Sequence, residues 1–376
     1  MFSLLKNATV YSPKYLGKKD ILFCLDKIVS VEDSINSTLF KDIEVIDCSN
    51  SIVFPGFIDL HVHIAGGGGE GGFNTRTSCA DAKDIISSGI TTVVGILGAD
   101  SITRSVANLF TTAKQLEQQG LSTYIYTGSY QVPVVTLTGS IQSDMVFIDK
   151  IIGVGEICLE DNRSFEPTFD EICTIAAQTR NGALISGKAG LVHFHMGTGF
   201  NGLDYLFRLM RETSIPKAHF LPTHVNRTKE LFSQATSYLQ EGGYIDLTAG
   251  FIPSSEDPNC IATYTAIKEL IDIGADISRV TMSSDAYGGI PIFDNMGNVI
   301  SSETVSTKIL FEELRIAIKD FGVDIEKAIS IITKNPAEIL KINNKKGSLE
   351  VGKDADCVIC DKDLNILNVF AMGKKY

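Results

Sequence analysis

Between about residue 52 and residue 340, short apolar runs alternate with stretches of helical character. Strands that are buried on both faces of a parallel sheet have such continuous apolar runs, because neither face of the strand meets water. Eight runs of this kind occur, at residues 52–60, 91–97, 123–127, 151–154, 191–194, 219–222, 244–247 and 280–283. Eight strands that alternate with helices indicate the α/β class and a (β/α)8 barrel of the TIM type.

The two ends of the chain have a different pattern. The first fifty or so residues consist of short β-rich segments and turns, and residues 43–47 alternate apolar and polar positions. The tail returns to β character from Gly347 onward. We therefore expect the two ends to form one small β-sandwich domain beside the barrel. The predicted boundaries are 1–54 and 343–376 for the two parts of that domain, and 55–342 for the barrel.

Composition narrows the function classes. The 376 residues are enough for one barrel and a satellite domain. The net charge of −12 argues against a nucleic-acid surface, which needs clustered Lys and Arg. The start of the chain turns polar before a signal-peptide core develops, and no run reaches the roughly 18 apolar residues of a membrane-spanning helix. We expect a cytoplasmic protein that binds neither nucleic acid nor membranes.

The eight cysteines are scattered along the chain. In a cytoplasmic protein of this size they are expected to be reduced and buried. Cys357 and Cys360 have the CxxC spacing, but they lie in an apolar β-like run without a second pair or a nearby histidine. We therefore expect no metal or redox site there.

The six histidines carry the strongest chemical signal. His61 and His63 end the first apolar run, and residues i and i+2 of a strand share a face, so both imidazoles can reach one ion. His195, His224 and Asp285 also stand at strand ends, on the side where barrel enzymes build their sites. One histidine alone is more often a core or surface residue than a ligand. Four at strand ends, with an aspartate, favour a metal centre.

The two remaining histidines, His193 and His219, sit earlier on their strands and are interpreted as structural. Glu156, at the end of the run around residue 154, is the best-placed sixth ligand. Two cations that lie close together need an anionic bridge to offset their repulsion, and a carboxylate can supply it. The alternative is an acid inside the barrel that is paired with an arginine.

Several motifs resemble the amidohydrolase superfamily, and specifically its isoaspartyl dipeptidase family. The segments 55–63 and 335–356 are similar to the start and the end of the superfamily's conserved region. More specific matches are found at 66–70, 74–77, 127–130, 161–164, 194–197, 222–227 and 283–285. The likeness covers essentially the whole chain, in order.

The resemblance implies two divalent metal ions, with zinc favoured by the His and carboxylate ligands. His61 and His63 would hold one ion together with Asp285, and His195 and His224 would hold the other. The sequence departs from the family's best-known pattern, in which a carboxylated lysine bridges the ions, because the matching residue is Glu156. A native carboxylate does the same work and needs no carbon dioxide. The family also implies a homo-oligomer.

The resemblance also implies the substrate contacts. Glu70, which follows a loop of four glycines that includes Gly68, would hold the α-ammonium of the aspartyl residue. Tyr130 would polarise the scissile carbonyl. Arg163 and Arg227 would bind carboxylates, which guanidinium groups recognise through paired hydrogen bonds.

Two positions depart from the family. Ala99 stands where the family often has Thr, and Gly289 replaces a Ser that can contact the substrate. Both departures bear on which dipeptide is preferred.

The expected reaction is hydrolysis of the isopeptide bond of β-aspartyl dipeptides by a metal-bridging hydroxide, with Asp285 as the proton acceptor. One alternative is another amidohydrolase reaction, on a cyclic ureide such as dihydroorotate or hydantoin, or on an N-acyl amino acid. Glu70 argues against a cyclic ureide, which has no free ammonium. A second alternative is a non-catalytic structural homologue, which the complete set of candidate ligands disfavours. The native metal and the residue that follows the isoaspartate stay open at this point.

Overall fold

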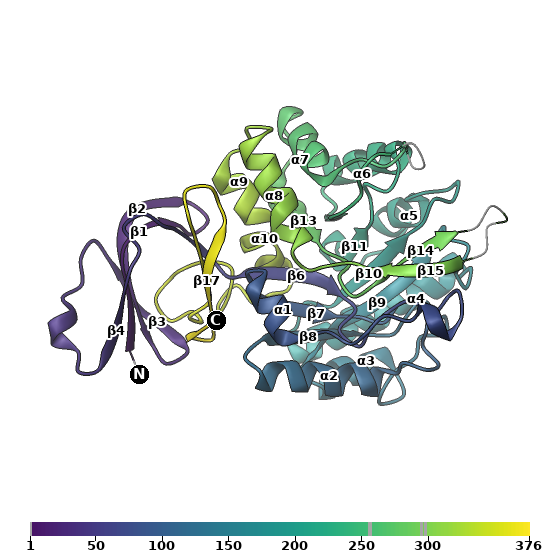
Figure 1. The fold of residues 1–376 in the computed structure, drawn as a ribbon. Helices are drawn as coiled ribbons and strands as arrows, with labels where there is room; N and C mark the ends of the chain where they lie inside the picture. Colours follow the sequence, from purple (N-terminus) through teal and green to yellow (C-terminus); the bar gives the residue numbers. More distant parts are fainter. Residues whose placement is uncertain (1, 255–257, 294–295, 297–298) are drawn as a thin grey trace.

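The computed structural model describes residues 2–254, 258–293, 296 and 299–376. Figure 1 shows two parts side by side: a large part in which helices surround a core of strands, and a smaller β domain that contains both chain termini. Among the described residues, no helix has the length and apolar character needed to cross a bilayer.

The large part contains eight parallel strands. They are β6 (Phe57–Val62), β7 (Ile90–Gly95), β8 (Ser122–Thr127), β9 (Ile151–Leu159), β10 (Leu191–Met196), β11 (Phe220–Thr223), β12 (Ile245–Thr248) and β13 (Val280–Ser283). Strands β6 to β11 form one sheet in chain order, and β12 pairs with β13. The first and last strands meet where the His63 amide donates to the Ala286 carbonyl at 2.9 Å. The predicted TIM-type barrel is confirmed.

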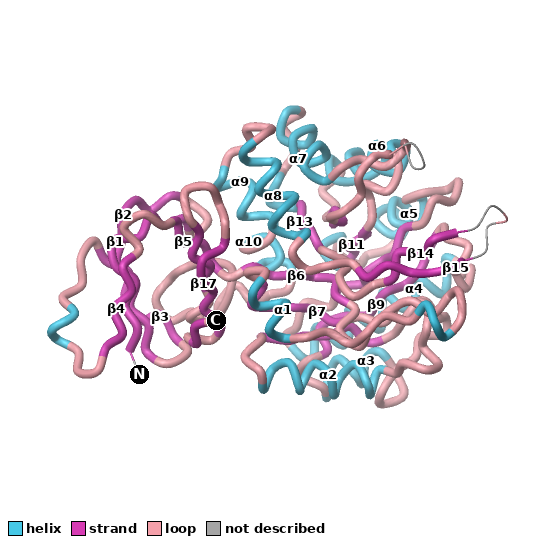
Figure 2. Tube along the Cα trace, in the orientation of Figure 1, coloured by secondary structure: helices cyan, strands magenta, loops and turns pink. Residues whose placement is uncertain are grey.

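Helices cover the outside of these strands, as the cyan and magenta segments of Figure 2 show. They are α1 (Ala82–Ser87), α2 (Val106–Gln118), α3 (Ile141–Phe147), α4 (Phe169–Ser186), α5 (Asp204–Glu212), α6 (Lys229–Gln240), α7 (Thr263–Asp272), α8 (Ile309–Lys319), α9 (Ile325–Ile331) and α10 (Lys334–Ile339). Short 3-10 turns are η1 (Ser37–Leu39), η2 (Phe73–Thr75), η3 (Lys217–His219) and η4 (Ile277–Arg279). Hydroxyl side chains begin several helices; Thr168 and Glu171, for example, form a reciprocal capping box at α4.

A β-hairpin that the sequence pattern did not predict follows β13. It consists of β14 (Gly289–Phe293) and β15 (Val299–Thr304), which pair antiparallel. The hairpin closes on the glycine-rich loop, because a Cβ on Gly71 would lie 2.6 Å from Val299 Cγ1. Glycine at this position therefore permits the close approach.

The small domain is one eight-stranded sheet. Its strands are β1 (Phe2–Tyr11), β2 (Tyr15–Cys24), β3 (Lys27–Glu32), β4 (Ile43–Asp47), β5 (Ile52–Pro55), β16 (Cys357–Cys360), β17 (Ile366–Ala371) and β18 (Lys374–Lys375). The sheet folds over its own core, since the rings of Phe23 in β2 and Phe370 in β17 lie 5.4 Å apart. Both termini contribute, as expected. With β5 in this sheet and β6 in the barrel, we propose the boundaries 1–54, 55–342 and 343–376.

A buried lysine joins the C-terminal segment to the barrel. Lys346 Nζ pairs with Asp356 and, at 2.8 Å, with Asp354, and it donates to Ser122 Oγ at 2.6 Å. Ser122 begins strand β8, and Asp356 directly precedes β16. Two carboxylates taken out of water are stabilised by one cation, which thereby fixes the small domain against the barrel.

We predict that Lys346→Met lowers the free energy of unfolding. The substitution leaves the buried Asp356 without a cation and leaves Asp354 with Lys27 alone, and breaking a buried pair costs about 3–5 kcal/mol. Urea unfolding measures the change. Lys345→Met is the matched control, because Lys345 is exposed. Equal unfolding free energies for the two variants would contradict this role of Lys346.

Candidate active site

An irregularity in strand β9 turns Glu156 into the barrel. Val154 pairs with Val192, but the next partners are Ile157 and Phe194, so β9 holds one residue more than β10 between the two pairs. Such a bulge bends a strand and redirects its side chains. Gly155 permits it, because a Cβ there would lie 2.9 Å from His193 Cβ. The carboxylate of Glu156 consequently points toward the ends of the neighbouring strands.

Three histidines surround that carboxylate. Glu156 Oε1 lies 2.6 Å from His195 Nδ1 and 3.2 Å from His224 Nε2, and Oε2 lies 3.5 Å from His61 Nε2. All four side chains are buried. These contacts are with histidines. They do not agree with the alternative in which Glu156 is an interior acid paired with an arginine.

Asp285 joins His63 to His61. Its Oδ1 lies 3.2 Å from His61 Nε2 and 3.1 Å from His63 Nε2. Asp285 and His224 follow the ends of β13 and β11 with φ of 55° and 60°, a conformation uncommon outside glycine. These turns aim both side chains at the barrel axis. The structure thus brings all six predicted metal ligands together.

Groups behind the ligands hold them in place. His193 Nε2 lies 2.9 Å from His61 Nδ1, and Thr248 Oγ1 lies 2.8 Å from His224 Nδ1. Burial and the neighbouring His61 ring lower the pKa of His193 to about 3, so His193 is neutral. The position of His193 early on its strand indicates a structural histidine, and its contact with His61 is in keeping with that role. His219, the other histidine interpreted as structural, lies 2.6 Å from the Gly190 carbonyl.

The electrostatics of the cluster favour ionised carboxylates. Burial raises the pKa of Glu156, but His61 and His195 lower it more, so that it ends well below its usual range. Burial acts in the same direction on Asp285, and His61 again outweighs it. Burial lowers the pKa of His61, whereas Glu156 and Asp285 raise it to about 9. The two acids therefore require positive charge between them.

The donor set fits divalent metal ions. His61 Nε2 and Glu156 Oε2 are buried and lie 3.5 Å apart, and neither makes a hydrogen bond. A buried polar atom without a partner is costly, and a cation coordinated by imidazole and carboxylate groups removes that cost. The spacing allows His61, His63 and Asp285 to share one ion, and also His61, Glu156 and His224.

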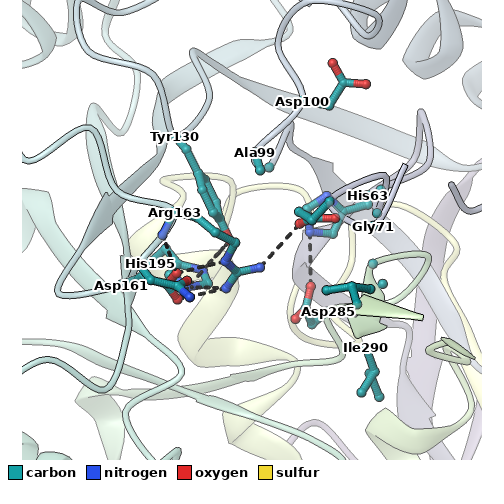
Figure 3. A pocket seen from close by; sticks show the side chains of 18 of the residues that line it. His63, Gly71, Ala99, Asp100, Tyr130, Asp161, Arg163, His195, Asp285 and Ile290 are labelled. Atoms are coloured by element: carbon teal, nitrogen blue, oxygen red, sulfur yellow. Dashed lines mark hydrogen bonds and ion pairs between the residues drawn. The ribbon is translucent and has the colours of Figure 1, made fainter. Parts of the chain in front are cut away.

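A cavity of about 910 Å³ opens beside these ligands. Its size is within the usual range for small-molecule sites. The walls include His63, His195 and Asp285 together with every predicted substrate-contacting residue: Gly68, Glu70, Ala99, Tyr130, Arg163, Arg227 and Gly289. Figure 3 shows Tyr130, Arg163, Asp161 and His195 grouped on one side of the cavity, and Asp285, His63 and Ile290 on the other.

Tyr130 touches a candidate metal ligand. Its hydroxyl lies 2.7 Å from His195 Nδ1. Burial and the Glu156 carboxylate hold the pKa of Tyr130 well above its usual value. The hydroxyl is therefore protonated at neutral pH and can donate a hydrogen bond into the cavity.

Three charged residues of the cavity wall had no predicted role: Asp100, Arg104 and Asp161. Asp161 lies between Arg163 and Arg227, and the sequence indicated it only as part of the family motif at 161–164. Arg104 is buried and donates to the carbonyls of Ala65 and Thr77, both at 3.1 Å, which ties down the glycine-rich loop. Because only the folded chain brings these residues to the cavity, their spacing in the sequence did not predict a role there.

Gly289 has an unexpected neighbour. A Cβ on Gly289 would lie 2.5 Å from Ser302 Oγ and 3.0 Å from Gly68 Cα. Ser302 belongs to β15, and its hydroxyl is buried without a hydrogen-bond partner. The hairpin therefore places a serine hydroxyl beside the position where the family often has a serine.

The sequence of the chain matches a known protein family. The sequence pattern of the amidohydrolase family matches residues 52–375. The chain belongs to the amidohydrolase family.

Solved amidohydrolase structures confirm the narrower resemblance to the isoaspartyl dipeptidases. A β-aspartyl dipeptidase from Fervidobacterium islandicum AW-1, solved in complex with the β-Asp-Leu dipeptide, is 45% identical with a TM-score of 0.93. The match covers 100% of this chain and 96% of that one. The predicted enzyme class, a hydrolase of this family, is thereby confirmed.

More distant amidohydrolases are also similar. A dihydroorotase from Elusimicrobium minutum is 25% identical over 95% of this chain and 88% of its own length. An N-acetylglucosamine-6-phosphate deacetylase from Pasteurella multocida shares the fold at 15% identity and a TM-score of 0.64, with 100% of both chains covered.

We predict that Gly289→Ser lowers kcat/KM on the enzyme's substrate by about 10-fold or more, since a shift of about 1 Å in a positioning group can cost this much. The new Cβ displaces either Ser302 or the backbone of Gly68. Steady-state kinetics measure the loss. The double variant Gly289→Ser/Ser302→Gly removes the overlap and should recover most of the activity. If Gly289→Ser alone has wild-type kcat/KM, the close packing of the hairpin on Gly68 does not matter for function.

Proposed function

We propose that this amidohydrolase cleaves β-aspartyl dipeptides with two divalent metal ions. The observation that carries the proposal is the placement of Glu70, Arg163 and Arg227 around one cavity beside the candidate metal ligands. The similarity to a dipeptidase solved with β-Asp-Leu supports the same substrate class.

The charges of the cavity complement those of the substrate. A β-aspartyl dipeptide carries one ammonium and two carboxylates, which call for one acid and two guanidinium groups. Glu70 Oε1 lies 3.3 Å from Arg163 Nη1. The substrate's ammonium and carboxylate would replace this ion pair by two new ones, so that no charged group loses its partner.

Two ions would be held by His61, His63 and Asp285 and by His195 and His224, with Glu156 between them. Zinc suits these nitrogen and oxygen donors. When bound, the ions polarise the scissile carbonyl and lower the pKa of water from near 16 toward about 7.

The chain's own groups then position the substrate and move protons. The Tyr130 hydroxyl donates to the carbonyl oxygen as negative charge develops there. Asp285 accepts the proton of the attacking water and passes it to the leaving nitrogen as the amide bond breaks. The products are aspartate and the free second amino acid.

The rival reaction is hydrolysis of a cyclic ureide, because curated relatives of this chain include dihydroorotases. Dihydroorotate has no free ammonium. Glu70 in the cavity favours the dipeptide, since an acid would face a substrate group with no positive charge.

We predict that the zinc-loaded protein releases leucine from β-Asp-Leu, but not from α-Asp-Leu, and does not open dihydroorotate. Glu70→Gln should raise KM for β-Asp-Leu about 10- to 100-fold, because a hydrogen bond between charged groups contributes about 1.5–3 kcal/mol. Amino-acid release measures both effects.

The matched control is Glu44→Gln, an exposed acid in β4 of the small domain. Its KM should equal that of the wild type. Ring opening of dihydroorotate without cleavage of β-Asp-Leu would contradict the proposed substrate and leave the barrel chemistry in place.

A further inference from the structure

The carboxylate of Asp161 contacts three functional side chains at once. It follows the end of β9, and its side chain is only 8% exposed. Oδ1 accepts from Arg163 Nε at 2.8 Å, and Oδ2 accepts from Arg163 Nη2 at 2.8 Å. Oδ2 also lies 3.4 Å from Arg227 Nη1 and 3.1 Å from His195 Nε2. Figure 3 shows these contacts as dashed lines between Asp161, Arg163 and His195.

The two nitrogens of His195 face different partners. Nδ1 lies 2.6 Å from Glu156 Oε1 and 2.7 Å from the Tyr130 hydroxyl, on the side of the other candidate ligands. Nε2 faces Asp161 Oδ2, with Arg163 Nη2 and Arg227 Nη1 each at 3.3 Å. Guanidinium groups only donate hydrogen bonds, so Asp161 is the acceptor available to an Nε2 proton among these contacts. A proton on Nε2 leaves the Nδ1 lone pair free to bind a metal ion.

An alternative role for Asp161 would be as a ligand of a third metal ion. Ligand atoms of Cys158, Asp161 and His195 lie close enough to surround an ion. Two guanidinium groups already supply positive charge at Asp161, and a further cation would be repelled by them. Burial also raises the pKa of the Cys158 thiol, which disfavours the thiolate that a metal would need. Asp161 is therefore an acceptor for side chains.

We propose that Asp161 is a positioning residue that ties the substrate-binding arginines to the second metal site. It orients Arg163 and Arg227 toward the cavity, and it fixes the His195 tautomer that presents Nδ1 to the ion. The role of Asp161 toward the two arginines rests on the proposed dipeptide substrate. Its role toward His195 does not depend on any substrate.

The test compares Asp161→Asn with the wild type in zinc release and in kinetics. The amide can donate as well as accept, so it no longer selects one His195 tautomer. A chromogenic chelator should remove one of the two ions at least about 10-fold faster, in line with the loss when a ligand's hydrogen-bond partner is removed. The other ion should leave at the wild-type rate. In excess zinc, KM for β-Asp-Leu should stay at least about 10-fold raised, because the arginines lose their anion.

Asp149→Asn is the matched control. Asp149 is exposed and lies two residues before β9, at the end of the strand opposite to Asp161. It should match the wild type in both measurements. Wild-type release of both ions from Asp161→Asn would overturn the role toward His195, as would equally faster release of both. An unchanged KM would overturn the role toward the arginines.

Asp161→Glu keeps the charge and moves the carboxylate by one methylene, so it tests geometry if Asp161→Asn does not fold. Faster release of one ion from this variant supports the proposal, and wild-type behaviour in both measurements overturns it. Zinc release needs no substrate. A wild-type protein that fails to cleave β-Asp-Leu would thus contradict the proposed function without deciding the role of Asp161 toward His195.

Discussion

The Glu156 carboxylate is buried inside the barrel within 3.5 Å of nitrogens from His61, His195 and His224. An ionised carboxylate in such surroundings is stable only with positive charge around it, because removal from water costs several kcal/mol even after relaxation. The bulge of β9, the glycine at 155 and the supporting contact from His193 all serve to bring these groups together. The site is thus built around an anion that requires cations.

A glutamate at this position has consequences for how the centre forms. The family's best-known bridge is a lysine whose side chain must first react with carbon dioxide. Glu156 is a carboxylate as soon as it is synthesised, so assembly of the proposed two-ion centre would need only the metal. Its side chain is shorter than a carboxylated lysine, and in this chain the bulge of β9 with Gly155 against His193 brings the carboxylate to the three histidines.

The barrel could be predicted from the sequence because buried parallel strands read as continuous apolar runs, and because strand ends share one face of the barrel. His61, His63 and Asp285 were recognisable for that reason. The sequence did not predict three features of the cavity. These are the contacts of Asp161, the Ser302 hydroxyl beside Gly289 and the hairpin beside the cavity. Each depends on loops whose three-dimensional path has no periodic signal, so only the folded chain reveals them.

The central claim, a two-ion centre bridged by Glu156, is tested most directly by counting zinc. Wild-type protein and a Glu156→Gln variant would be dialysed against zinc, passed over a desalting column and analysed for metal per chain. We expect two ions for the wild type, and one or none for the variant, because a neutral amide cannot offset the repulsion between two cations. Two ions retained by Glu156→Gln, or one ion in the wild type, would contradict this expectation.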